Sequence, residues 1–310
     1  MVIKKYKYEK YLYKWLLNKR KFVKESTYAN YSNIVFKYII PFIGNYYINS
    51  INHDILQNYI FILSDNNLSN KTIKDIMLIV KSTIKQLFYD NKIKIFNLKF
   101  YYPKDNKNKK MYVLSKNEQN KLMEYILNNI NNKNIGILLS LMLGLRIGEV
   151  CALKYSDIDF KRNIIHINKT LQRIYIKENK KSYTKIIITE PKSINSIRDI
   201  PVNENIIKIL KKFNKSKDYY ILTNNNKYIE PRVYRSYFNN LLKKLNINHF
   251  SFHSLRHTFA TNCISLNIDY KTVSELLGHS NINITLNLYV HPNISQKRKC
   301  INMIYKNITK

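Results

Sequence analysis

The segment from residue 103 to residue 110, Pro-Lys-Asp-Asn-Lys-Asn-Lys-Lys, contains no apolar side chain. Such a stretch cannot contribute to a hydrophobic core, and its charge suits a linker that runs along a phosphate backbone. The chain has 310 residues, whereas one domain usually has roughly 100–200. We therefore expect two domains, residues 1–102 and residues 111–310, joined by the linker 103–110, with a carboxy-terminal tail from about residue 292.

Apolar residues before the linker recur at helical spacing in four places. The four predicted helices cover residues 8–20, a stretch from Thr27 that stops at Pro41 and Gly44, residues 53–63, and residues 70–87. Short connections between them predict a small helical bundle. The Lys and Tyr side chains on its polar faces suit contact with phosphate and sugar.

Two local signals organise the start of the second domain, which we place near Met111. Ser115 and Glu118 form a capping box, which predicts that a helix begins there. Gly144 follows a long apolar run, so it can end one helix in a left-handed cap and place Arg146 at the start of the next.

The pattern then changes to β-branched runs at residues 164–167, 185–189 and 198–202. We predict a small antiparallel sheet in which the last two strands form a hairpin with its tip at residues 191–196. We predict that the final third of the chain is helical. The predicted fold class is therefore mainly α with a small antiparallel β-sheet.

The charge of the chain is strongly unbalanced. Lys and Arg number 53 against 20 acidic residues, which gives a formal net charge of +33. Adenine- and thymine-rich coding can supply lysines, but it does not explain so few carboxylates. The excess implies a polyanionic partner, and nucleic acid is the first candidate. A basic RNA-binding protein is an alternative, although the sequence lacks a recognisable RNA-binding module.

The three cysteines form no close pair, so we expect no disulfide and a reduced compartment. The basic amino terminus lacks the apolar run of a secretion signal. The longest apolar stretch, residues 135–145, is short for a membrane span, which needs about 20 residues. We expect a cytoplasmic protein with no membrane partner.

The side chains best suited to catalysis lie between His253 and Tyr289. Apolar spacing predicts a helix over residues 252–267 with Phe252, Leu255, Phe259, Cys263 and Leu266 buried. His253 and Arg256 are three apart, so they share another face and can reach one ligand together. His253 and His257 also have the spacing of a His-Glu-x-x-His zinc motif. Ser254 stands where that motif has Glu, and Arg256 would repel a cation, so we expect no metal.

Three groups of residues, in this order along the chain, resemble the signature of the tyrosine recombinases, also called the phage integrase family. They are Gly-Leu-Arg-Ile-Gly-Glu at 144–149, Pro191-Lys192 with Arg-Asp-Ile-Pro at 198–201, and His-Ser-Leu-Arg-His at 253–257 with Leu-Gly-His-Ser at 277–280 and Tyr289. The predicted bundle and basic linker resemble the family's core-binding (SAM-like) domain. The resemblance covers nearly the whole chain.

The resemblance implies a site-specific recombinase that cuts and rejoins duplex DNA with Tyr289 as its nucleophile. Arg146 and Arg256 would bind the non-bridging oxygens of the scissile phosphate, a role that suits guanidiniums because each donates parallel hydrogen bonds. His253 would assist proton transfer from the tyrosine. Lys192 would protonate the departing 5′ oxygen as general acid.

Further residues would support this chemistry. His279 would hydrogen-bond the phosphate beside Tyr289, and Glu149 would orient the site without touching DNA. His257 is expected to be a structural partner, with Glu149 as the candidate. Tyr270 is the second candidate for the nucleophile. Because the reaction conserves bond energy in a 3′-phosphotyrosyl link, we expect no cofactor.

The resemblance also implies partners. We expect double-stranded DNA with inverted-repeat core sites and a homotetramer on two sites, acting in integration, excision, inversion or resolution of a mobile element. An accessory directionality factor is a further candidate partner. The tail would dock on a neighbouring protomer or pack on its own domain. Because the bundle begins almost at once, we expect no additional amino-terminal arm-binding domain.

Two other functions fit parts of this pattern. A type IB topoisomerase would use the same nicking and resealing step on one strand. A non-catalytic DNA-binding relative would need only the charge. The complete set of candidate catalytic residues argues against the second.

Overall fold

The structure is a computed structural model that describes residues 6–94, 96–104, 112–178, 181–191, 193–248, 250–289, 298, 301–302 and 304–305. The chain divides into two compact units. Unit 1 comprises Met1–Lys109 with Arg173–Ile186, and unit 2 comprises Lys110–Gln172 with Ile187–Lys310. Residues 105–110 of the predicted linker lie outside the described residues. None of the described helices is both long and apolar enough to cross a membrane.

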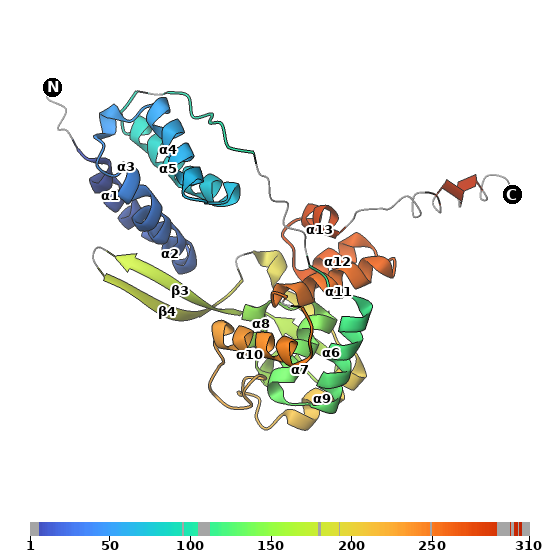
Figure 1. The fold of residues 1–310 in the computed structure, drawn as a ribbon. Coiled ribbons are helices and arrows are strands. Elements are labelled where there is room, and N and C mark those ends of the chain that lie inside the picture. The colour runs from blue at the N-terminus through green and yellow to red at the C-terminus, as the bar shows by residue number, and fades with distance from the viewer. Residues whose placement is uncertain are drawn as a thin grey trace. The chain divides into compact units, whose positions relative to one another are not determined.

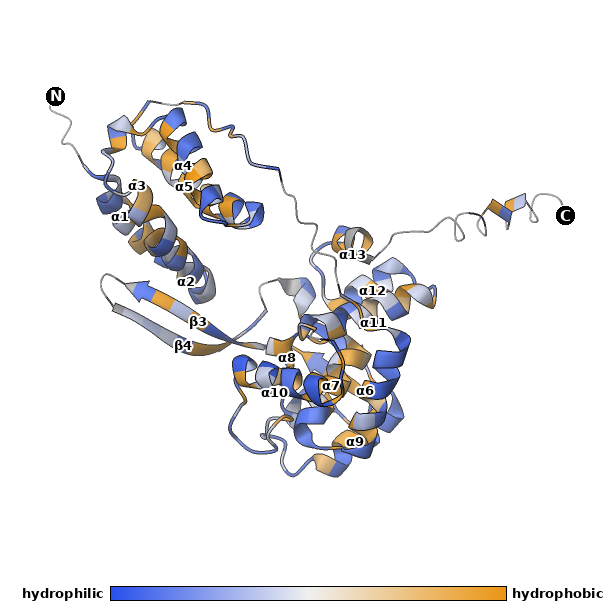
Figure 2. Ribbon diagram, viewed as in Figure 1, coloured by the Kyte–Doolittle hydropathy of each residue, from blue (hydrophilic) through white to orange (hydrophobic). Residues whose placement is uncertain are grey.

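Unit 1 contains a bundle of helices (Figure 1). They are α1 (Tyr8–Arg20), α2 (Glu25–Ile34), α3 (Ile40–Ile43), α4 (His53–Asp65) and α5 (Asn70–Tyr89), with a π-helical turn at Val35–Ile39 and a 3-10 helix at Ile48–Ser50. Each of the longer helices has an apolar and a polar side, as the hydropathy colours of Figure 2 show. The apolar stripe of α5 is buried, with Ile73, Ile76 and Met77 fully shielded from water. The predicted helices at 8–20, 53–63 and 70–87 are confirmed, and the second predicted helix is present as α2, the π-helical turn and α3.

Pro41 does not end the second predicted helix. Proline lacks the N–H that an α-helix interior needs, and its ring clashes with the carbonyl four residues before it. The π-helical turn at Val35–Ile39 changes the bonding register just before Pro41, which then lies in the first turn of α3. The helical run ends before Gly44, as predicted, and the Gly44 N–H donates to the Ile40 carbonyl at 3.0 Å.

The predicted pairing of the strands is wrong. Strands β3 (Thr170–Glu178) and β4 (Lys181–Thr189) pair with each other, whereas β5 (Arg198–Pro201) pairs with β2 (Ile164–Ile167). Strand β3 was not predicted. Its residues Ile174 and Ile176 are two apart and both buried, the spacing that marks a strand. Only residues 179–180 separate β3 from β4, a connection short enough to close a hairpin.

Residues 173–186 of this hairpin belong to unit 1, where they contact α2. The Ser32 hydroxyl donates to the Lys177 carbonyl, and Lys185 Nζ lies 3.0 Å from Glu25 Oε1. The Lys177 ammonium also lies over the ring of Phe36. These contacts hold the described part of the hairpin against α2 and the π-helical turn that follows it.

Unit 2 combines helices with a small sheet. Its helices are α6 (Lys116–Asn128), α7 (Asn132–Leu143), α8 (Ile147–Ala152), α9 (Glu204–Phe213), α10 (Pro231–Lys244), α11 (His253–Ser265), α12 (Tyr270–Leu277) and α13 (Ile282–Tyr289). Its antiparallel sheet has the order β1-β2-β5, where β1 is Ile158–Asp159. Ile165 of β2 lies opposite Ile200 of β5, and both are buried. The fold is thus mainly α with small antiparallel sheets.

Helices α7 and α11 pack against each other and form the centre of unit 2. The apolar run at 135–143 lies in α7 and is buried, as predicted, except for Met142, which is 44% exposed. On α11, Leu255 and Cys263 are buried, also as predicted. Leu266 is 72% exposed, because α11 ends at Ser265 and the chain turns away from the core there.

Capping residues fix the helix boundaries near the site. Ser115 and Glu118 form the predicted capping box of α6. Gly144 ends α7 with a φ of +67°, in the left-handed region that favours glycine. A Cβ atom at Gly144 would lie 2.6 Å from Phe259 Cδ1 and 2.8 Å from Leu277 Cδ2, so the chain can turn here only without a side chain.

We expect Gly144→Ala to lower the free energy of unfolding by about 1–3 kcal/mol, because it adds backbone strain and a clash with two core side chains. Urea unfolding followed by circular dichroism measures this loss. Asn267→Gly is the matched control, since Asn267 has a φ of +59° and is exposed. It should change stability by less than about 0.5 kcal/mol. Equal losses in the two variants would contradict the account.

Candidate active site

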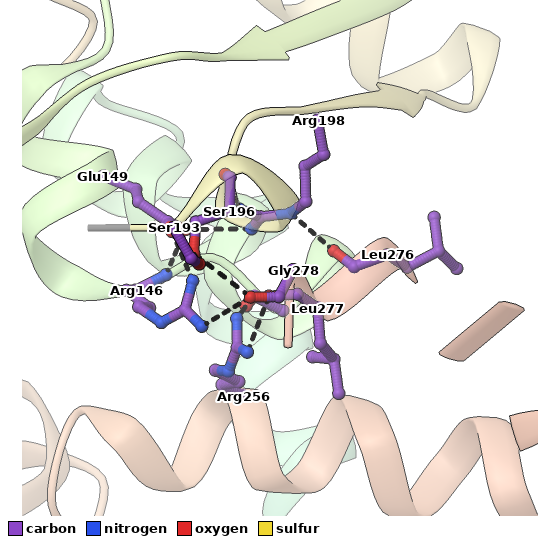
Figure 3. A network of polar contacts seen from close by, with 10 residues as sticks. Arg146, Glu149, Ser193, Ser196, Arg198, Arg256, Leu276, Leu277 and Gly278 are labelled. Carbon is purple, nitrogen blue, oxygen red and sulfur yellow. Dashed lines mark hydrogen bonds and ion pairs between the residues drawn. The ribbon is translucent and has the colours of Figure 1, made fainter. Parts of the chain in front are cut away.

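The carboxy-terminal end of α12 gathers three arginines from three different elements (Figure 3). Its last carbonyls have no partner within the helix and carry partial negative charge, so they attract cations. The bonds are Arg198 Nε to the Leu276 carbonyl at 2.6 Å, Arg256 Nη2 to the Leu277 carbonyl at 2.7 Å, and Arg146 Nη2 to the Gly278 carbonyl at 3.1 Å. Successive main-chain carbonyls therefore set the positions of three guanidiniums.

Gly278 makes this arrangement possible. Its φ of +64° ends α12 in the left-handed conformation. A Cβ atom here would lie 3.0 Å from the Asn195 carbonyl oxygen and 3.1 Å from Arg198 Cδ. The glycine of the Leu-Gly-His group thus lets β5 and the turn before it approach the end of α12.

Arg146 lies at the N-cap of α8, as predicted. Its Nη1 donates to Glu149 Oε1 at 2.7 Å, and its main-chain N–H donates to Glu149 Oε2 at 2.9 Å. The side chain is 34% exposed. Arg146 is therefore both held in orientation and reachable from solvent.

Glu149 is buried and accepts hydrogen bonds on both oxygens from two arginines. Arg198 binds it in a parallel pair, with Nη1 at 3.1 Å from Oε1 and Nη2 at 2.9 Å from Oε2. Burial alone would raise the pKa of Glu149, but the hydrogen bonds and charges of Arg198 and Arg146 outweigh it and lower the pKa to about 2. The carboxylate therefore stays ionised at any physiological pH.

Arg256 forms the floor of the site. Its side chain belongs to α11 and is 1% exposed. Nη1 donates to the Gly144 carbonyl at 2.9 Å and Nη2 to the Leu277 carbonyl. These bonds join the ends of α7 and α12, so the charge of Arg256 is fixed relative to Arg146.

His253 begins α11 beside these arginines, and its side chain is exposed on one side. Its ring meets that of His257 edge to face, with centroids 4.5 Å apart. Partial loss of water, then the nearby His257, Arg256 and Arg146, lower the pKa of His253 to about 4. A neutral imidazole at pH 7 can accept a proton.

His279 ties α13 to the site. Its Nδ1 lies 2.8 Å from Thr285 Oγ1, and Thr285 is fully buried in α13. Loss of water, followed by the charges of Arg256 and Arg146, lowers the pKa of His279 to about 3. The helix that ends at Tyr289 is thereby attached to the ring of His279.

The structure brings together six of the eight residues that the sequence singled out: Arg146, Glu149, His253, Arg256, His257 and His279. Lys192 and the side chain of Tyr289 lie outside the described residues. Both oxygens of Glu149 accept from Arg146 and Arg198, and the suggested partnership of His257 with Glu149 stays a prediction. His257 packs on His253.

Arg198 is the functional candidate that sequence reasoning missed. It lies in the Arg-Asp-Ile-Pro motif at 198–201, for which the sequence predicts no role of this side chain. A usable signal was present, since Arg198 and Ile200 alternate with Asp199 and Pro201 along β5 and so face the core. A buried arginine is usually paired with a carboxylate, and Glu149 belongs to another of the predicted motifs.

Within the described ranges, no group of three or more His, Cys, Asp or Glu side chains is arranged so that it could hold a metal ion. The zinc spacing of His253 and His257 therefore has no third ligand of these types among the described residues. The chemistry that the site can support rests on its guanidiniums and neutral imidazoles.

Comparison with known proteins adds to this geometry. The model of the phage integrase family matches residues 112–296, more than half of the chain, and that of the phage integrase N-terminal SAM-like domain matches residues 7–64. The chain belongs to the phage integrase family. The residues matched by the family model include Arg146, Arg198 and Arg256.

Among curated relatives of this integrase-family chain, a XerC-like tyrosine recombinase of Caldanaerobacter subterraneus is 32% identical over 186 residues, 54% of this chain and 47% of the relative. The chain thus spans about half the length of that relative. The ICEBs1 integrase of Bacillus subtilis is 25% identical over 86% of this chain and 74% of its own length. The Tn1549 transposon integrase, solved in complex with transposon right-end DNA, has the same fold, with a TM-score of 0.80 at 23% identity over 97% of this chain and 100% of that one.

We expect the stability of the chain to fall as the pH is lowered from 7 to 5. The pKa values of His253, His257 and His279 are lowered in the folded state, whereas an unfolded histidine titrates near about 6.5. Protonation in this window therefore favours the unfolded chain. Unfolded carboxyl groups titrate at about 3.9–4.3, below the window. Thermal unfolding at pH 7, 6 and 5 measures the effect.

His279→Gln removes one of these groups while keeping a side chain that can hydrogen-bond Thr285. Its melting temperature should depend less steeply on pH than that of the parent protein over the same range. A parent protein whose melting temperature is constant from pH 7 to 5 would contradict the prediction, as would identical slopes in the two proteins.

Proposed function

We propose that the chain is a site-specific tyrosine recombinase that cuts and rejoins duplex DNA through a 3′-phosphotyrosyl intermediate. The observation that carries this proposal is the grouping of Arg146 and Arg256, held by main-chain carbonyls, beside the neutral rings of His253 and His279. Fixed guanidiniums suit a phosphate whose charge grows in the transition state. Membership in the phage integrase family favours recombination over a type IB topoisomerase.

In the proposed cleavage step the Tyr289 hydroxyl attacks the scissile phosphorus. A bond forms between the tyrosyl oxygen and phosphorus, and the bond from phosphorus to the 5′ oxygen breaks. Tyrosine has a pKa of about 10, so its proton needs an acceptor, which His253 supplies. Lys192 gives a proton to the departing 5′ oxygen.

The rejoining step reverses these transfers. A 5′ hydroxyl from the partner duplex attacks the phosphotyrosine, and Tyr289 leaves with a proton. Arg146 and Arg256 neutralise the phosphate in both directions. Because His279 contacts Thr285 of α13, it connects the phosphate site to the helix that ends at Tyr289.

The proposed substrate is double-stranded DNA with inverted-repeat core sites, bound by a homotetramer on two sites. Residues 1–102 would form the core-binding domain, 103–110 the linker and 111–310 the catalytic domain. The net charge of +33 supports a polyanionic substrate. The DNA complex of the Tn1549 integrase, which has this fold, is a further support.

Tyr289→Phe should abolish the covalent complex while leaving DNA binding within about threefold of the parent, because only the attacking oxygen is lost. A nicked suicide substrate that carries the paired sites of the element encoding the gene traps the covalent complex. Denaturing gel electrophoresis then detects it, and a mobility shift measures binding.

Tyr270→Phe is the matched control, since Tyr270 is the second candidate and begins α12 in the same unit. It should form the covalent complex at the parental rate. A covalent complex in Tyr289→Phe would place the nucleophile elsewhere. A parent protein that binds the paired sites tightly and forms no covalent complex would instead be a non-catalytic DNA-binding relative.

A further inference from the structure

We propose that Arg198 is a positioning residue of the site, which fixes the direction of the Arg146 guanidinium through the carboxylate of Glu149 that the two arginines share. The inference rests on the proposed function, because it concerns how Arg146 is presented to the scissile phosphate. It assigns a role to a side chain that the cleavage and rejoining steps do not use.

All three guanidinium nitrogens of Arg198 donate within the protein. Nε bonds the Leu276 carbonyl, Nη1 bonds Glu149 and the Ser196 carbonyl, and Nη2 bonds Glu149. The side chain is 6% exposed. Arg198 therefore acts through its protein partners and not through a contact with DNA.

Arg198 determines the orientation of Glu149. Its parallel pair of bonds fixes the plane of the carboxylate, and Arg146 then donates to the same two oxygens, to Oε1 from Nη1 and to Oε2 from its main-chain N–H. Without Arg198, the carboxylate could rotate and Arg146 would rotate with it. A buried carboxylate that loses one of two cationic partners is also strongly destabilised.

The same arginine connects the turn that follows Lys192 to the site. This turn is the 3-10 helix at Ile194–Ser196, whose last carbonyl accepts from Arg198 Nη1 at 3.2 Å. The Ser196 hydroxyl lies 3.3 Å from the Gly278 carbonyl, which also accepts from Arg146. Figure 3 shows Ser196, Arg198 and Arg146 around this end of α12.

Loss of Arg198 should make cleavage sensitive to acid. Among the residues that the structure describes, the charged and titratable groups that face Glu149 are Arg146 at the N-cap of its own helix, Arg198 from β5 and His253 from α11. Burial raises the pKa of Glu149, and Arg198 is the leading group that lowers it. Once Arg198 is gone, Glu149 takes up a proton as the pH falls, and its bond to Arg146 Nη1 weakens.

The test is single-turnover cleavage of the suicide substrate at saturating DNA from pH 5 to 8, with each rate expressed per DNA-bound molecule. Arg198→Met should cleave slower by on the order of 10²-fold, the effect of a displaced catalytic group. Its rate should fall further toward pH 5, more steeply than the parental rate, while its affinity for DNA stays within about threefold.

Two more variants separate positioning from a general loss of structure. Arg198→Lys keeps a cation beside Glu149, so it should lose less activity and show no added acid sensitivity. Glu149→Gln combined with Arg198→Met has no buried carboxylate to titrate, so the added acid sensitivity should disappear. Arg162→Met is the matched control, because it removes an exposed arginine that lies near Asp159 in the same unit, and it should cleave like the parent.

Arg198→Met that cleaves at the parental rate per bound molecule would overturn the inference while leaving the proposed function intact. Added acid sensitivity that persists in the double variant would also overturn it, because Glu149 could not be the titrating group. A parent protein that does not cleave at all would refute the proposed function, and this inference with it.

Discussion

The arrangement of the site depends on the end of one short helix. Helix α12 stops in a left-handed glycine, and its last carbonyls accept hydrogen bonds from Arg198, Arg256 and Arg146. Guanidiniums repel one another, so they gather only where partial negative charge and a carboxylate offset the repulsion. The α12 carbonyls and Glu149 supply that charge. The positions of the arginines are thus set before any DNA is bound.

Loss of water, together with this concentration of positive charge, lowers the pKa of the neighbouring histidines His253 and His279. Arg256 and Arg146 lower the pKa of both His253 and His279, in addition to the effect of lost water. The result is a positively charged site that still offers neutral nitrogens at pH 7, as the proposed binding of a phosphate and acceptance of a proton require. Attraction of the substrate and acceptance of a proton would conflict if the histidines were charged. Under the proposed function, arginine binds the phosphate and histidine accepts the proton.

Local signals predicted most of the fold and much of the site. Ser115 with Glu118 and Gly144 predicted helix boundaries because capping depends on neighbouring residues alone. The pairing of β5 with β2 was missed, because these strand partners are distant in sequence: His166 lies opposite Asp199, 33 residues away. Arg198 was overlooked for the same reason, since its partners Glu149 and Leu276 lie 49 and 78 residues away. Most of the candidate residues that the motifs predicted still lie together in the structure.

Arg146 and Arg256, the arginines that we propose bind the scissile phosphate, are held in place by main-chain carbonyls in the DNA-free structure. Nuclear magnetic resonance of the arginine side-chain nitrogens in the DNA-free chain at neutral pH tests this most directly. The account predicts resolved, slowly exchanging Nη protons that disappear individually in Arg146→Lys and Arg256→Lys. Nη signals from these two residues that stay averaged, like those of solvent-exposed arginines, and become resolved only when DNA is added would contradict it.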